Sequence, residues 1–223
     1  MRIEKADAKE LIELDAQAVR ESARLIAKVT RPDLARPTPC ADWTLHGLLT
    51  HMTTQHYGFA AAAQGDGDPA QWRSRPLGDD PVAAYRAAAD RVLEAFAADG
   101  VLDREFPLPE FKRGLMYPAR QAIGFHFVDY VVHSWDVAKT LGLSTNLDPA
   151  LLDAAHNVAQ AVPGGDARTE PGAAFAPGVA WSGHARLDQI VALLGRPPAW
   201  QPPPVQPSPA QPPPAQPPSA ARP

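Results

Sequence analysis

Four ionisable side chains share one stripe of a predicted helix. In the stretch 126–136, His126, Asp129, His133 and Asp136 follow one another at steps of three, four and three residues. Side chains three and four positions apart lie on the same face of an α-helix. Apolar residues flank this stripe, so its polar groups need pairing, hydration or a metal ion to offset the cost of burial. The alternative is a helix whose polar stripe faces water, and spacing alone leaves both interpretations open.

A histidine from a second predicted helix completes a possible metal site. This helix is expected to begin at Thr44, which can cap it, and to run to about Ala63, with His51 on its inward side. Metal sites in helical bundles are built from facing helices. His51, Asp129 and His133 would leave a divalent ion with an open position, as in catalytic sites. A hydrogen-bonded core histidine is the other interpretation of His51.

Helical periodicity and helix-end signals predict an all-α chain. Asp80-Pro81 and Asp148-Pro149 each combine a capping residue with a proline at the first helical position. The stretch 101–116 is compatible with a long loop or with a short hairpin. The sequence shows no alternation of strands with helices, so four long helices should form a bundle with shorter elements outside it. The expected helices span about 7–29, 44–63, 81–100, 118–142, 148–162 and 185–194.

Two regions of different composition set the expected domain boundary. Residues 1–200 can form one helical domain with a sizeable core. Residues 201–223 are almost wholly Pro, Gln, Ala and Ser, and Arg222 is their only charge. Such a segment cannot bury a core, so we expect a disordered Pro-rich C-terminal tail.

Composition also restricts the partners and the compartment. The net charge is −4 and there is no basic run, which argues against nucleic acid as a partner. Cys40 is the only cysteine, so the chain can form no internal disulfide, and we expect a small buried thiol rather than a nucleophile. No stretch resembles a signal core or reaches membrane-spanning length. We therefore expect a cytoplasmic protein with no membrane partner.

Three motifs, in this order, resemble one known family. They are Thr38-Pro39-Cys40-Ala41-Asp42-Trp43-Thr44 with Leu48-Leu49-Thr50-His51, then Asp129-Tyr130-Val131-Val132-His133-Ser134-Trp135-Asp136, then Leu193-Leu194-Gly195-Arg196-Pro197-Pro198-Ala199-Trp200. The first is similar to a TPC–W–T…LL–H opening, the second to an E–x–x–x–H–x–W–D helix and the third to an LLGR–PAW close. The family is the actinobacterial branch of the DinB-like metal-binding proteins, related to mycothiol-dependent maleylpyruvate isomerase.

The resemblance implies a DinB-like four-helix bundle with metal ligands at His51, Asp129 and His133. It also implies that Asp136 lies close to the metal. There Asp136 is the candidate catalytic residue, able to move a proton or to orient His133, and a surface or helix-end hydrogen bond is the alternative. The family usually has Glu at the first acidic position, so Asp129 has a shorter reach. His126 is outside the family pattern, and we expect it either to add a ligand or only to line the pocket.

The implied chemistry joins a divalent ion, zinc in the first place, to a small-molecule thiol such as mycothiol. The ion would lower the pKa of the thiol, and the thiolate would attack an electrophilic carbon in a transferase or isomerase reaction. The predicted partners are a small-molecule substrate and a low-molecular-weight thiol, and a homodimer is compatible with the sequence. The alternatives are a metal- or ligand-binding protein without turnover, and a helical interaction protein whose Pro-rich tail binds partners.

Overall fold

The computed structural model describes residues 5–40, 43–110, 114–170 and 173–203. Its regular structure is almost entirely helical, which confirms the all-α prediction. The α-helices are α1 (Lys5–Ile26), α2 (Leu45–Ala63), α3 (Pro81–Phe96), α4 (Ala119–Leu141), α5 (Pro149–Ala161) and α6 (Arg186–Leu193). The described residues also form short 3-10 helices that periodicity did not predict, namely η1 (Arg31–Ala35), η2 (Pro69–Trp72), η3 (Val101–Asp103) and η4 (Gly165–Arg168).

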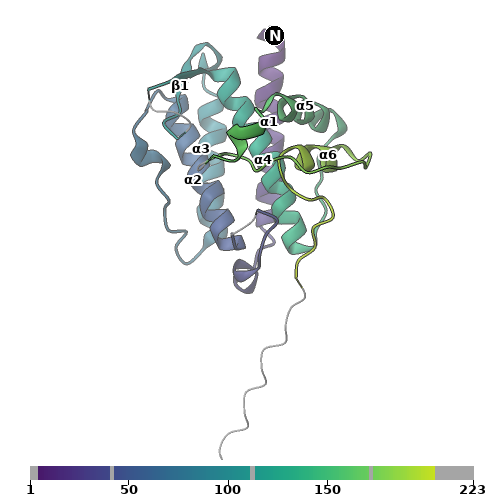
Figure 1. The fold of residues 1–223 in the computed structure, drawn as a ribbon. Coiled ribbons are helices and arrows are strands. Elements are labelled where there is room, and N and C mark those ends of the chain that lie inside the picture. Colours follow the sequence, from purple (N-terminus) through teal and green to yellow (C-terminus); the bar gives the residue numbers. More distant parts are fainter. Residues whose placement is uncertain (1–4, 41–42, 111–113, 171–172, 204–223) are drawn as a thin grey trace, which may run out of the picture.

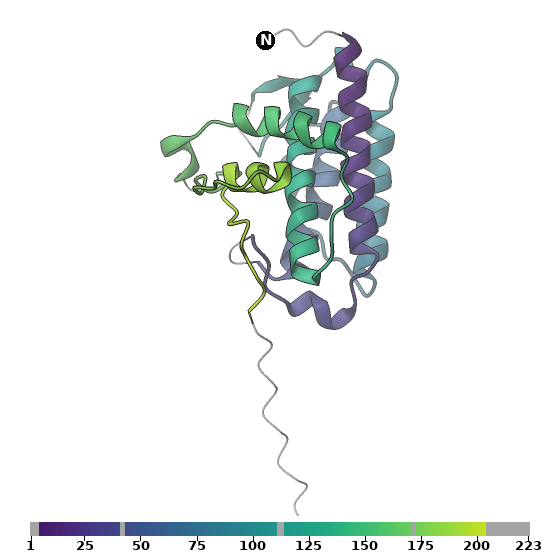
Figure 2. The same cartoon turned by 90° about the vertical axis from the view of Figure 1, so that its right-hand side faces the viewer.

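Helices α1 to α4 lie side by side as a bundle (Figure 1). Helix α4 packs most extensively against α1, and α2 packs most extensively against α3. The contact between α2 and α4 is smaller. Helices α5 and α6 pack on each other and cross the side of the bundle next to α4 (Figure 2). This arrangement agrees with the prediction of four long helices and shorter elements outside them.

Two of the three predicted N-terminal caps form, and α3 ends at Phe96 rather than at position 100, where the sequence predicted its end. Thr44 caps α2 by accepting a hydrogen bond from the Gly47 amide, 3.4 Å away. Asp80 caps α3 in the same way through the Ala83 amide, at 2.9 Å. The equivalent cap predicted for Asp148 at α5 was wrong, because the Asp148 side chain makes no capping bond. There the proline at the first turn presets the helical backbone instead.

The stretch between α3 and α4 is a hairpin rather than an irregular loop. Strand β1 (Glu105–Pro107) pairs antiparallel with β2 (Met116–Pro118), with Phe106 opposite Tyr117. Phe106 is fully buried and packs in a satellite core with apolar side chains of α2, α3 and α4. The larger core joins α1, α2 and α4 to α5 and α6. The hairpin therefore closes one end of the bundle.

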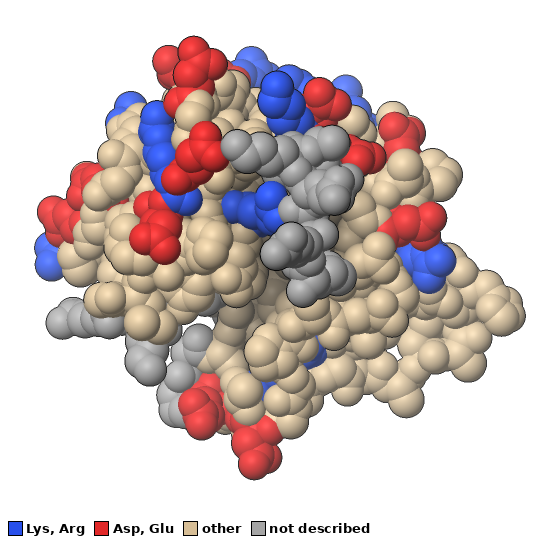
Figure 3. Space-filling view, turned by 90° about the horizontal axis from the view of Figure 1, so that it is seen from above, with Lys and Arg blue, Asp and Glu red and all other residues tan. Residues whose placement is uncertain are grey.

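Two further sequence predictions concern the surface and the C-terminus. No helix among the described residues is both long and apolar enough to cross a membrane. On the face seen in Figure 3, basic and acidic side chains are interspersed around the described part of the surface. The predicted tail, 201–223, falls outside the described residues from position 204 onward.

Candidate metal centre

Three side chains from two helices converge between α2 and α4. One ligand atom from each of His51, Asp129 and His133 lies within 4.8 Å of the others. His51 is on α2, and Asp129 and His133 are one turn apart on α4. Among the described residues, this is the only group of three or more His, Cys, Asp or Glu side chains with such a geometry. The structure therefore brings together the three residues predicted as metal ligands.

Packing of α2 aims His51 toward α4. Leu48, Leu49 and Met52 surround His51 in the sequence and are fully buried in the core. Burying one leucine side chain stabilises a fold by about 1.5–3 kcal/mol, so rotating α2 about its axis would be costly. The Trp43 ring lies 4.6 Å from the His51 ring and forms a wall of the site. The residues around His51 thus fix the direction in which its side chain points, and Trp43 covers one side of its ring.

Asp136 orients the second histidine. His133 Nδ1 is 2.9 Å from Asp136 Oδ2, and Asp136 is fully buried. An Nδ1–H that donates to this carboxylate leaves the lone pair of Nε2 for another partner, and Nε2 points to Asp129. Metal-binding histidines usually donate their other N–H to a carboxylate in this way. Of the two roles predicted for Asp136, the contact supports the orientation of His133.

Arg196 is a site residue that the sequence reasoning did not single out. Its Nη2 lies 3.4 Å from Asp136 Oδ2 and 3.2 Å from Cys40 Sγ, and its Nη1 donates to the Leu194 carbonyl. The side chain is buried, so its charge compensates the buried Asp136 carboxylate. Its position in the motif 193–200 was the available signal. Cys40, expected to be a small buried thiol, is half-buried and accepts the hydrogen bond from Arg196.

The electrostatics of the site keep His51 uncharged, so that a ring nitrogen has a lone pair available for a metal ion. Burial lowers the pKa of His51 to about 4, with a further lowering by the neighbouring His133 and against the opposing effect of Asp129. His51 is therefore neutral at pH 7. The Asp129 side chain keeps 20% of its surface exposed. The cluster is thus open to solvent on the Asp129 side.

The donor set fits a divalent ion. Asp129 Oδ1 and His133 Nε2 are 3.3 Å apart. Two ligand atoms at about 2.0–2.1 Å from one tetrahedral zinc ion lie about 3.3 Å from each other. Asp129 therefore reaches the cluster although it is one methylene shorter than Glu. Three protein ligands would leave a fourth position for a small molecule.

His126 lies on the same predicted stripe but belongs to a different cluster. Its Nδ1 is 2.7 Å from Asp15 Oδ1, and its Nε2 is 3.1 Å from His56 Nδ1. It is fully buried and is absent from the ligand group. His126 therefore adds no ligand, because other side chains occupy both of its ring nitrogens. His56 is a packed core residue and His46 is exposed.

Comparison with known proteins identifies the family. A family model described as the mycothiol maleylpyruvate isomerase N-terminal domain matches residues 16–138. The chain belongs to this family. The match covers more than half of the chain and contains His51, Asp129, His133 and Asp136. The resemblance proposed from the three motifs is confirmed, and the converging His and Asp side chains agree with a metal-binding family.

Two similar proteins come from Mycobacterium tuberculosis. Uncharacterized protein Rv0738 of strain ATCC 25618 / H37Rv is 36% identical over 177 residues, which cover 78% of this chain and 91% of the relative. Uncharacterized protein MT0763 of strain CDC 1551 / Oshkosh shows the same identity and coverage. The similarity therefore extends beyond the segment 16–138 that the family model matches.

Proposed function

We propose that this protein is a divalent-metal-dependent enzyme that activates a low-molecular-weight thiol, mycothiol or a similar one. The thiol would be transferred to an electrophilic small molecule or would promote its isomerisation. One observation carries this proposal: the ligand atoms of His51, Asp129 and His133 converge within 4.8 Å from two helices. Membership of the mycothiol maleylpyruvate isomerase N-terminal domain family supports the choice of thiol.

Zinc is the proposed metal because of the donor set. Two imidazole nitrogens and one carboxylate oxygen suit Zn²⁺, and three protein ligands are typical of catalytic zinc sites. The low pKa of His51 keeps its ring neutral, and the hydrogen bond to Asp136 directs Nε2 of His133 into the cluster. His51 therefore needs to lose no proton to bind an ion at neutral pH.

Each residue has a defined task in this proposal. His51, Asp129 and His133 would hold the divalent ion, which would lower the pKa of the thiol so that a thiolate can exist near neutral pH. Asp129 supplies the anionic ligand on the open side, and Trp43 covers the side of His51. Asp136 holds the His133 ring, and Arg196 balances the charge of Asp136. In a transferase reaction the thiolate would form a C–S bond while a leaving group departs from the electrophilic carbon with its bonding electrons. In an isomerase the thiolate would add to a carbon–carbon double bond, breaking its π bond, and after rotation the C–S bond would break to restore the double bond and the thiolate.

The test combines metal analysis with a thiol assay. Protein purified without chelator should carry about one divalent ion per chain, and mixing it with mycothiol at neutral pH should raise the ultraviolet absorbance of thiolate. Chelator-treated protein is the control and should not change the thiol. Absence of metal would contradict the proposal. One ion per chain without an effect on mycothiol would instead support a metal- or ligand-binding protein without turnover.

A further inference from the structure

A second polar cluster connects all four helices of the bundle. Asp15 Oδ1 contacts His126 Nδ1 at 2.7 Å, and His126 Nε2 contacts His56 Nδ1 at 3.1 Å. His56 Nε2 is 3.1 Å from the Tyr85 hydroxyl, which is 2.5 Å from Ser22 Oγ. Each of these side chains is at most 1% exposed. We call Asp15, His126, His56, Tyr85 and Ser22 the polar chain; it runs through α1, α4, α2, α3 and back to α1.

The hydrogen bonds of the polar chain have one possible direction. Ser22 Oγ donates its proton to the Val19 carbonyl at 2.7 Å, so it must accept from the Tyr85 hydroxyl. The Tyr85 oxygen then accepts from His56, which places a proton on His56 Nε2. His56 Nδ1 is left as an acceptor and receives the Nε2–H of His126. Each link therefore depends on the one before it.

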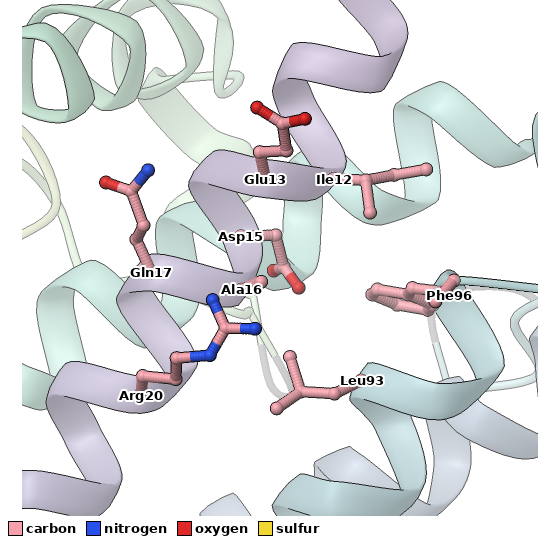
Figure 4. Close-up of a pocket in the computed structure, with 9 residues that line it drawn as sticks. Ile12, Glu13, Asp15, Ala16, Gln17, Arg20, Leu93 and Phe96 are labelled. Carbon is pink, nitrogen blue, oxygen red and sulfur yellow. The ribbon is translucent and has the colours of Figure 1, made fainter.

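The charges within the polar chain agree with this direction. Burial and the neighbouring His126 keep the pKa of His56 well below its ordinary value, so His56 is neutral. Burial raises the pKa of Tyr85, which stays a phenol able to donate. The contact between His126 Nδ1 and Asp15 Oδ1 then needs a single proton. Asp15 ends the polar chain on α1, beside a groove lined by α1 and α3 (Figure 4).

Aromatic rings hold the middle of the polar chain in place. The His126 ring has Phe59, Phe96 and Tyr130 at centroid distances of 5.0, 5.2 and 4.2 Å. The Tyr130 ring also stacks on His56 at 4.1 Å. With these rings packed around them, the two imidazoles cannot swing away from each other without opening the core.

The polar chain is linked to the metal ligands through their immediate neighbours in the sequence. The Tyr130 hydroxyl donates to the Met52 carbonyl, which joins α4 to α2. Tyr130 follows the ligand Asp129, and Met52 follows the ligand His51. This hydrogen bond and the contact between His56 and His126 are two polar links between α2 and α4, next to the apolar core that the helices share.

We infer that the polar chain positions α2 against α4 and so sets the separation at which His51 meets Asp129 and His133. His56 and His126 are positioning residues in this account, since they lie outside the ligand group. The inference rests on the proposed metal site and adds a determinant of its geometry. It requires that the directed hydrogen bonds of His56 keep the ligands in place. An apolar side chain of similar volume at this position should not be enough.

Two substitutions at one position separate these possibilities. His56→Gln keeps an acceptor for His126 and a donor for Tyr85, whereas His56→Leu keeps neither. His46→Leu, at an exposed position of the same helix, is the control. In folded samples titrated with Co²⁺, we expect His56→Leu to lower the affinity about tenfold or more, as loss of a supporting contact does at other metal sites. His56→Gln and His46→Leu should stay close to wild type, and the Co²⁺ absorption spectrum should change only in His56→Leu.

Measurements on the metal-free protein keep the test independent of metal binding. Nitrogen-15 NMR should show His56 as a neutral ring protonated at Nε2, and a nuclear Overhauser contact should connect the rings of His51 and His133. That contact should persist in His56→Gln and weaken in His56→Leu. A wild-type protein that binds no Co²⁺ but shows these NMR signals would contradict the proposed function alone. Equal Co²⁺ affinity in His56→Leu and wild type, or a proton on His56 Nδ1, would overturn the positioning role.

Discussion

Helices α2 and α4 present two histidine pairs to each other, and the pairs differ in what their nitrogens do. The ring centroids are 5.3 Å apart both in His51–His133 and in His56–His126. In the second pair the rings are hydrogen-bonded to each other and to Asp15 and Tyr85. In the first pair the Nε2 of His133 faces Asp129, and the rings share no hydrogen bond within the described residues. The distance between two histidine rings therefore does not show whether they are metal ligands or hydrogen-bonded core residues.

The carboxylates show the same contrast. Asp129 is 20% exposed, whereas Asp15 is 1% exposed and has one oxygen without a hydrogen-bond partner in the described structure. A half-open carboxylate beside two histidines can receive a small molecule or an ion from solvent. A carboxylate that is closed off from solvent can only accept hydrogen bonds from the side chains that already surround it. The four predictions that follow test this division between an open site and a closed one.

Removing His126 from the buried pair His56–His126 should have the largest effect on stability. His126→Leu leaves the Asp15 carboxylate buried without a partner, which should lower the free energy of unfolding by about 3–5 kcal/mol. Urea unfolding of the metal-free protein measures this loss. His51→Ala removes a ring that lies beside Trp43 and His133 and leaves no buried carboxylate without its partner, so it is the matched control and should change the stability far less. Equal losses in both variants would remove the distinction between the two pairs.

Removing the carboxylate that orients His133, in the pair His51–His133, should lower the metal affinity rather than the stability. Asp136→Asn removes the negative charge that accepts from His133 Nδ1, and such changes typically cost about 10–100-fold in metal affinity. Competition of zinc with a chromogenic chelator measures the loss, and helical circular dichroism should be unchanged. An affinity equal to wild type would show that Asp136 does not orient His133.

Acid should destabilise the metal-free protein through both pairs. The pKa of His51 is lowered to about 4 and that of His56 is lowered well below its ordinary value, mainly by burial, whereas both titrate near pH 6.5 in the unfolded chain. Above that pH the folded and unfolded states bind equally few protons. Below it the unfolded state binds more, so stability falls by about 1.4 kcal/mol per pH unit for each histidine. Urea titrations at several pH values should show this slope, and His56→Gln should remove about half of it. A stability that is flat below pH 6.5 would contradict the neutral state of both rings.

Removing the Pro-rich tail should have the smallest effect. Residues from Pro202 onward contain no apolar pattern that could pack on the bundle. A chain that ends at Gln201 should therefore keep its melting temperature and its metal affinity. Calorimetry of the two forms decides the point. A fall of more than a few degrees would show that the tail packs on the helical domain.

The sequence was sufficient for much of the fold because its signals are local. Helix boundaries follow from Thr44, Asp80 and Gly142, and each of these residues acts on the backbone next to it. The stripe on α4 likewise predicted that Asp129 and His133 lie on one face. The roles of His126 and Arg196 depend on partners far away in the chain. Periodicity could not show that Asp15 occupies one nitrogen of His126, or that Arg196 reaches Asp136.

The central claim is that His51 and His133, far apart in the chain, bind one ion together. Metal content per chain, measured for wild type, His51→Ala and His133→Ala purified without chelator, tests it most directly. We predict about one divalent ion in wild type and none in either variant, with helical circular dichroism retained in all three, because α2 and α4 are held by apolar packing. A His51→Ala protein that keeps its full metal content while His133→Ala loses it would contradict the claim, since His51 would then be a core histidine and not a ligand.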